Sequence, residues 1–318
     1  MSSSESGSGR LRAYIEFIAA LVYFFFARGL AYSAALGLAR EQWIQESWMP
    51  LVEQAMLLFL LVIGYACMGF ALDHQLHPVQ AQGLPRRTSW LQETGLGLAV
   101  GWALAVACVL PMIVAGGIAI VLFLGLPAWG WLLADAAFFA LAALAEEVAF
   151  RGYGFQRFVR AVGPVGAALG YAAFYAFVQT FMPGSSHISI AVSVVFSLLL
   201  SMAYLRTGAL WVSWGINFGW KASRALVFGL AISGVSSHSP VVQGNPMGPF
   251  WLTGAGFGLD GSWVALVLLL AALPVVYRLT RELNQRCHTP EIAPADEPGA
   301  VAQPAAASDP VQPTDGQP

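Results

Sequence analysis

The feature that most constrains this chain is a series of apolar stretches, each about 20 residues long. A helix of that length crosses the roughly 30 Å hydrocarbon core of a bilayer. Eight such stretches occur, at residues 13–39, 48–72, 95–124, 130–150, 162–182, 188–205, 209–232 and 262–277. Only 10% of the residues are charged, against about 25% in an ordinary soluble domain, which is too few to cover a soluble surface. We therefore predict an all-α, polytopic membrane protein with about eight transmembrane helices.

The arginines outside these stretches predict how the helices cross the membrane. With eight crossings, the N-terminus, the even-numbered loops and the C-terminus share one side. Ten arginines fall on that side: Arg10, Arg12, Arg86, Arg87, Arg157, Arg160, Arg206, Arg278, Arg281 and Arg286. The loops of the other side contain only Arg40. Because basic residues favour cytoplasmic loops, we expect a multi-pass protein of the plasma (inner) membrane with both termini in the cytoplasm. The remaining four basic residues belong to the apolar stretches themselves: Arg28, Arg151, Lys221 and Arg224.

The rest of the chain suggests a single membrane domain with two polar ends. Residues 1–12 are rich in Ser and Gly, and residues 287–318 are rich in Pro and Ala and poor in large apolar side chains, so we expect both segments to be disordered. Residues 13–286 form the transmembrane domain. The first apolar stretch is too long for the core of a cleavable signal peptide and is interpreted as an anchor. No basic stripe indicates a nucleic-acid partner, so membrane lipid is the expected surrounding.

Charged residues interrupt the fourth apolar stretch, in the segment ALAEEVAFRGYG at residues 143–154. Glu147 and Arg151 are four residues apart, so they face each other on a helix and can pair. Glu146 points about 100° away and is left to meet another helix or a water-filled cavity. A structural ion pair needs only one glutamate, and ionisable residues inside a membrane commonly mark functional sites. We therefore interpret this cluster as part of a functional site.

Polar residues in later stretches predict what Glu146 meets. Gln179 lies in the fifth stretch, and Asn217 and Lys221 lie one turn apart in the seventh. An amide alone is more often a hydrogen-bonding contact between helices, but Lys221 is the only lysine of the chain and needs a counter-charge. Glu146 is the obvious one. We expect the fourth, fifth and seventh stretches to pack around one buried polar cavity, reachable from the cytoplasmic side or laterally from lipid.

Three segments resemble a known family. They are the two glutamates and the arginine with the continuation RGYGFQ, YLRTGALWVSW at residues 204–214, and WLTGAGFGLDGS at residues 251–262. In this order they resemble the CPBP family (CAAX protease and bacteriocin-processing, also called Abi or type 2 CAAX prenyl protease-like) over residues 141–273. The resemblance implies an intramembrane endopeptidase in which a glutamate activates a water positioned by two histidines, with or without a bound metal.

The sequence departs from the family pattern at both histidines. The second motif, an aromatic residue followed four positions later by histidine, is here Tyr175 and Gln179. The third motif, histidine followed four positions later by asparagine, is here Asn217 and Lys221. Neutral amides are poor substitutes for imidazole ligands, and an ammonium would bring positive charge to the place of a metal ion. We therefore expect no cofactor and no bound zinc or other metal.

Three functions follow from this site, which consists of the six candidate residues Glu146, Glu147, Arg151, Gln179, Asn217 and Lys221. The lost histidines and the acquired lysine favour a degenerate, pseudoenzyme member that binds or scaffolds a membrane protein or peptide. The intact glutamates favour a working endopeptidase in which Gln179 and Asn217 hold the water by hydrogen bonds. A transporter or lipid-binding protein, with Lys221 receiving an anionic group, is the third alternative.

Overall fold

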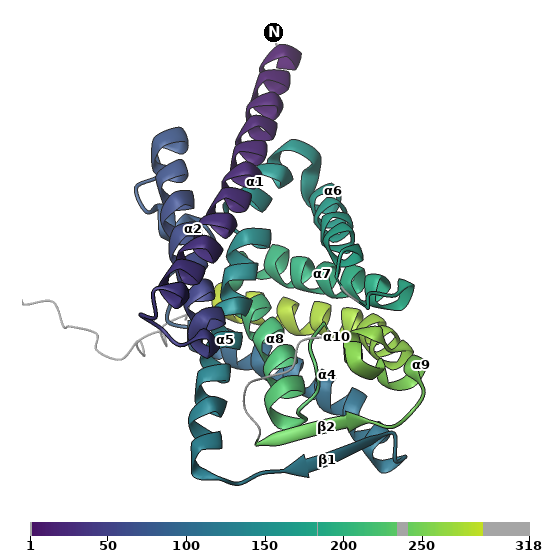
Figure 1. Cartoon of the computed structure of the whole chain (residues 1–318). Coiled ribbons are helices and arrows are strands. Elements are labelled where there is room, and N and C mark those ends of the chain that lie inside the picture. The colour runs from purple at the N-terminus through teal and green to yellow at the C-terminus, as the bar shows by residue number, and fades with distance from the viewer. Residues whose placement is uncertain (1, 183, 234–240, 289–318) are drawn as a thin grey trace, which may run out of the picture.

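The computed structural model describes residues 2–182, 184–233 and 241–288, and these are almost entirely helical (Figure 1). The α-helices are α1 (Ser2–Arg40), α2 (Met49–Asp73), α3 (Pro78–Ala81), α4 (Trp90–Val114), α5 (Leu126–Arg151), α6 (Tyr153–Thr180), α7 (His187–Thr207), α8 (Leu210–Ala222), α9 (Phe250–Thr253) and α10 (Trp263–His288). Short helical turns are η1 (Glu46–Trp48), η2 (Ser223–Val227), η3 (Ala255–Phe257) and η4 (Leu259–Gly261). The predicted all-α polytopic architecture is confirmed, whereas the tail from residue 289 lies outside the described residues.

Six segments of the described chain are long and apolar enough to cross a membrane. They are Gly9–Arg40, Glu46–Asp73, Trp90–Val114, Ala128–Thr180, His187–Thr207 and Trp263–Leu283. One of them contains two helices, because Gly152 between α5 and α6 has non-helical torsion angles. The seventh predicted stretch forms the 13-residue helix α8 followed by the π-helical turn η2, so it is shorter than the other long helices. The structure thus places a helix in each of the eight apolar stretches, but α8 is not among the segments long enough to span.

Two predictions about local structure are wrong. The third apolar stretch does not continue as helix to residue 124, because α4 ends at Val114 and the chain turns at Gly116 (φ 73°) into strand β1 (Ile118–Leu122). This strand pairs antiparallel with β2 (Val242–Pro246), and its β-branched residues favour a strand over a helix. Residues 2–12, expected to be disordered, belong to α1, because extending an existing helix adds one hydrogen bond per ordered residue.

Arginine side chains join the ends of several helices at one end of the molecule, which we call the basic end. The starts of α1 and α6 and the ends of α2, α7 and α10 meet there. The contacts are Arg12 with the Leu72 carbonyl, Arg157 with Asp73 (2.6 Å), Arg87 with the Thr207 carbonyl (3.0 Å), and Arg206 over the Tyr277 ring (4.1 Å). Strands β1 and β2 lie at the opposite, far end, where α4 finishes (Figure 1). Members of the arginine set that was predicted to share one side therefore lie together.

Glycines allow α4 and α8 to pack with their backbones in contact. Gly97 and Gly101 of α4 face Gly215 and Gly219 of α8, and each pair has the spacing of four that places both on one helix face. A Cβ atom added at any of the four would collide with backbone atoms of the other helix. Close packing of this kind drives helix association in membranes, where lipid tails are as apolar as leucine. This close packing places α8 among α4, α5 and α7.

Two apolar clusters surround α5 and α8. One includes buried residues of α4, α7, α8 and α10, such as Leu199 and Ile216. The other gathers mainly residues of α1, α2, α5 and α6, such as Leu61 and Phe155. Because α5 also packs against α8, the charged residues of these two helices lie where the clusters meet.

We expect both termini to lie on the cytoplasmic side, because the basic end carries the arginine-rich segments. Reporter fusions that are active only in the cytoplasm, placed at each terminus of the full chain, should both be active. A fusion at Arg40, between α1 and α2, serves as the control for the opposite side. Termini with different reporter activities would contradict the arrangement.

Gly101→Ala should destabilise the protein by about 1–3 kcal/mol, because the added methyl group has no space against the backbone of α8. Gly95→Ala is the matched control in the same helix, since a Cβ atom there meets no other atom within 4 Å, and alanine is the better helix former. Thermal unfolding in detergent should show a lower midpoint for Gly101→Ala alone. Equal midpoints for both variants would show that the glycine contact is not required.

Candidate functional site

The most deeply buried charges of α5 form an ion pair within the helix. Arg151 Nη1 donates to Glu147 Oε1 at 3.1 Å, and the two side chains are 2% and 0% exposed. Arg151 Nη2 also donates to the carbonyl and hydroxyl oxygens of Ser197 in α7, both at 3.1 Å. The predicted pairing four residues apart is confirmed, and the same arginine links α5 to α7.

Glu146 faces the other way and pairs with the lysine of α8. Lys221 Nζ donates to Glu146 Oε1 at 2.5 Å, which confirms the predicted counter-charge. The side chains of Lys221 and Glu146 are 12% and 32% exposed, so this pair lies at the edge of open space. Each of the two adjacent glutamates therefore has its own cation, one from α5 and one from α8.

Asn217 joins the two ion pairs. Its Nδ2 group donates to Glu146 Oε2 at 3.1 Å and to Glu147 Oε1 at 3.0 Å. Both oxygens of Glu146 are thus engaged, one by an ammonium and one by an amide. Three buried atoms of this network have no hydrogen-bond partner within the described residues: Glu147 Oε2, Asn217 Oδ1 and Arg151 Nε. The result is a neutral network of two carboxylates, two cations and one bridging amide, which we call the glutamate network.

A cavity of about 490 Å³ adjoins this network. Glu146, Lys221 and Gln179 line it, whereas Glu147 and Asn217 are buried and do not reach it. The predicted convergence of the fourth, fifth and seventh stretches is confirmed, but only three of the five expected residues face the cavity. Gln179 lines it without a hydrogen bond to either glutamate in the described structure.

A turn inside α6 brings Gln179 to the cavity. Gly163 has φ 84°, a conformation that favours glycine, and Pro164 begins the second limb of the helix. The two limbs fold against each other, since the Tyr171 ring packs edge-on against Phe155 with centroids 5.2 Å apart. The second limb therefore runs back beside the first and ends next to the cavity.

The cavity lies mostly in the half of the molecule away from the basic end. Its lining includes Gln54 near the start of α2, Met182 after the end of α6, Val192 near the start of α7, and Ser233 beyond η2. All of these positions are near the far end. The lining thus favours entry from the far half over entry from the basic end, which was predicted to be the cytoplasmic side. Lateral entry from lipid stays a prediction.

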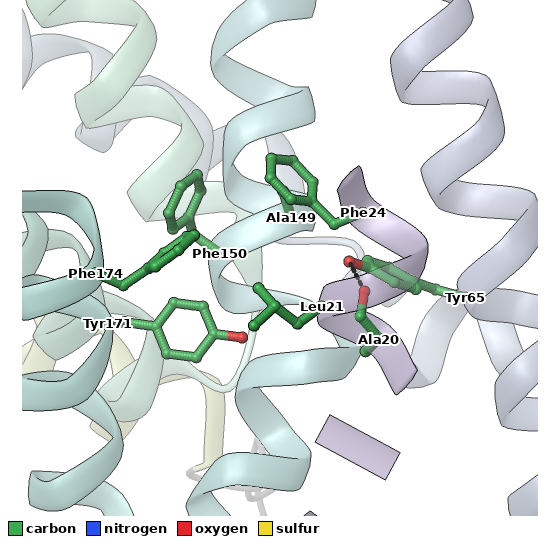
Figure 2. Close-up of a pocket in the computed structure, with 8 residues that line it drawn as sticks. All are labelled: Ala20, Leu21, Phe24, Tyr65, Ala149, Phe150, Tyr171 and Phe174. Carbon is green, nitrogen blue, oxygen red and sulfur yellow. Dashed lines mark hydrogen bonds between the residues drawn. The ribbon is translucent and has the colours of Figure 1, made fainter. Parts of the chain in front are cut away.

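A smaller void next to the cavity is a packing defect between α1, α2, α5 and α6 (Figure 2). Its volume is about 10 Å³, which is at most the space of one water. Tyr65 donates its hydroxyl proton to the Ala20 carbonyl at 3.3 Å, and aromatic rings such as Phe150 and Phe174 form the walls. This void has no room for a ligand.

Two contacts of the site were not predicted from the sequence. Ser197 supports Arg151, and serines at positions 193, 197 and 201 recur every fourth residue along buried α7. Arg224, known only as a cation within an apolar stretch, pairs with Asp260 at 2.6 Å across 36 residues and lies over the Trp220 ring. No spacing rule connects residues so far apart, so the second pair had no signal in the sequence.

The donor groups do not fit the metal that the family resemblance implies. Among the described residues, no three His, Cys, Asp or Glu side chains come together in a group that could hold a metal ion. Both glutamates already face cations, and the remaining groups are the amides of Gln179 and Asn217. Transition metals prefer imidazole, thiolate or carboxylate ligands, so we derive no chemistry through a metal.

Comparison with known proteins gives one match. The family model described as Type II CAAX prenyl endopeptidase Rce1-like matches residues 126–223. This segment runs from α5 to the end of α8 and supplies all six candidate residues of the site. No curated protein and no solved structure matches the chain. The segment that forms the site thus resembles the Rce1-like family, which bears out the resemblance to CPBP-family membrane proteins drawn from the sequence motifs.

Proposed function

We propose that this chain is a degenerate CPBP-family protein that binds a membrane-protein or peptide partner in its cavity and does not hydrolyse it. The observation that carries this proposal is the contact of Lys221 Nζ with Glu146 Oε1 at 2.5 Å. A general base must have a free oxygen within hydrogen-bond reach of the proton that it takes. Here an ammonium holds one oxygen of Glu146 and an amide holds the other.

The replaced residues act together in this proposal. In the family pattern, position 217 is a histidine and position 221 an asparagine. Here the asparagine side chain reaches the two glutamates, and the lysine places a positive charge beside the one that faces the cavity. The cavity persists beside this neutral network, which supports binding as its function.

One observation favours the alternative of a working endopeptidase. Glu146 is 32% exposed and lines the same cavity as Gln179. Each carboxylate oxygen keeps a second lone pair, so a water held by the Gln179 amide could donate to Glu146, attack a peptide carbonyl and pass its proton through the carboxylate to the leaving amine. For the transporter or lipid-binding alternative, Lys221 is already paired and is not a free receptor for an anion.

Wild-type protein in proteoliposomes should cleave a fluorogenic prenylated CAAX peptide no faster than Glu146→Ala. The triple variant Gln179→His, Asn217→His, Lys221→Asn restores the two histidines and the asparagine of the family pattern beside Glu146 and removes the competing ammonium, so it should gain metal binding by mass spectrometry and Glu146-dependent cleavage. Cleavage by the wild type that Glu146→Ala abolishes would establish the endopeptidase alternative instead.

Removal of Arg151 or Lys221 should destabilise the protein, and the loss should be larger where the glutamate left without its cation is more deeply buried. Arg151→Gln should cost about 3–5 kcal/mol, because it leaves a fully buried carboxylate without its cation. Lys221→Asn should cost less, about 1.5–3 kcal/mol, because Glu146 is partly exposed. Arg160→Gln is the control, since Arg160 is 60% exposed and 3.9 Å from Asp73, and exposed pairs contribute at most about 1 kcal/mol. Thermal unfolding in detergent measures all three, and a Lys221→Asn variant as stable as its parent would contradict the ion-paired network.

A further inference from the structure

Arg28 of α1 lines the same cavity but takes no part in the glutamate network. It lies inside the apolar segment Gly9–Arg40, and its side chain is exposed. A cation within a membrane segment is costly unless it meets an anion or water. The question is which anion Arg28 meets.

The other cations inside the apolar stretches have carboxylate partners. Arg151 pairs with Glu147, Lys221 with Glu146, and Arg224 with Asp260. No carboxylate lies within salt-bridge distance of Arg28 in the part of the chain that the structure describes. Asp135 also lines the cavity, but it is 3% exposed and has an interaction of its own. The guanidinium of Arg28 therefore remains available to a ligand.

The walls around Arg28 suit an apolar chain. Eight aromatic side chains line the cavity: Phe24, Phe25, Phe138, Phe139, Phe150, Tyr175, Phe196 and Trp220. The volume of about 490 Å³ lies within the range of about 300–1,000 Å³ that is typical of small-molecule sites. A ligand that fits both features has an apolar chain and one anionic group.

The position of Arg28 along α1 fixes where the anionic group would lie. Arg12 reaches the Leu72 carbonyl at the basic end, and Arg28 follows sixteen residues later, or about 24 Å along the helix. In a hydrocarbon core of about 30 Å, this places Arg28 close to the far interface. An amphiphile can leave its head there, at the polar boundary, while its chain extends inward toward Glu146.

We infer that the cavity binds a single-chain anionic amphiphile, whose carboxylate or phosphate is held by Arg28 and whose chain lies among the aromatic side chains. A guanidinium can donate two parallel hydrogen bonds to either group, which an ammonium cannot. The inference rests on the proposed function, because it requires a cavity that serves to bind. It names Arg28 as the residue that receives the anion, in place of the already paired Lys221.

Palmitate and hexadecyl phosphate carry an anionic group on a 16-carbon chain, whereas hexadecanol has the same chain without the charge. Comparing them separates the contribution of the charge to binding from that of the chain. With the full chain in dodecyl maltoside, we expect one bound palmitate or hexadecyl phosphate per protein by native mass spectrometry. A direct binding assay should give an affinity at least roughly tenfold higher than that of hexadecanol. Arg28→Gln should lose this difference, and Arg28→Lys should keep part of it. Arg40→Gln, at the end of the same helix and outside the cavity lining, is the matched control and should bind as the wild type.

The same assay in nanodiscs distinguishes a bilayer lipid from a free amphiphile. Arg28-dependent competition by phosphatidylglycerol, but not by phosphatidylcholine, would show that a bilayer headgroup can supply the anion. Undiminished palmitate binding in phosphatidylglycerol would assign the site to a free amphiphile. Both outcomes support the Arg28 site. No palmitate binding, equal affinity for palmitate and hexadecanol, or wild-type affinity in a folded Arg28→Gln variant would overturn it. Glu146-dependent peptidase activity would refute the proposed function and would leave these binding results unchanged.

Discussion

The neutralisation of two adjacent carboxylates inside a bilayer is the constraint on which this structure depends. A single buried charge in a medium of low polarity costs several kcal/mol unless it is paired. Glu147 is satisfied within its own helix by Arg151, but Glu146 points away and must find its cation elsewhere. That cation comes from α8, so the second charge on α5 requires α8 to pack where Lys221 can reach it. Asn217 adds the link between the two pairs and holds them as one unit.

The glycine contact between α4 and α8 helps to hold α8 in the position that this charge pairing requires. Lipid tails offer no hydrophobic drive for helices to associate, so close backbone packing has to supply the attraction. Gly215 and Gly219 lie on the face of α8 that meets α4. Asn217 and Lys221 lie between and beyond them in sequence and reach α5. One face of the short helix α8 thus packs against α4, and another face presents its polar groups to α5.

The cavity combines two walls of different character. One wall carries a neutral, hydrogen-bonded network in which Glu146 already has two donors. The wall formed by α1 carries Arg28 among aromatic rings. Gln179 and Lys221 line this cavity where the family pattern has a histidine and an asparagine, and the rest of the lining is largely apolar. Under the proposed function, binding depends on the shape of the cavity and on the charge of Arg28, and neither requires Glu146 to act as a base.

The sequence by itself determined that this chain folds in a lipid bilayer and where its helices approximately lie. It also determined the pairing of Glu147 with Arg151 and the choice of Lys221 as the partner of Glu146. These follow from local periodicity and from the need of each intramembrane charge for a counter-charge, both of which are properties of the residues alone. Only the tertiary structure decided that Arg224 meets Asp260, that α6 doubles back at Gly163, and that Glu147 and Asn217 lie outside the cavity. It also placed Arg28 in the cavity lining with no carboxylate partner among the described residues. Those facts depend on which helix faces come together. A pattern of 3.6 residues per turn tells which residues share a face, but only the packing of one helix against another tells what that face meets.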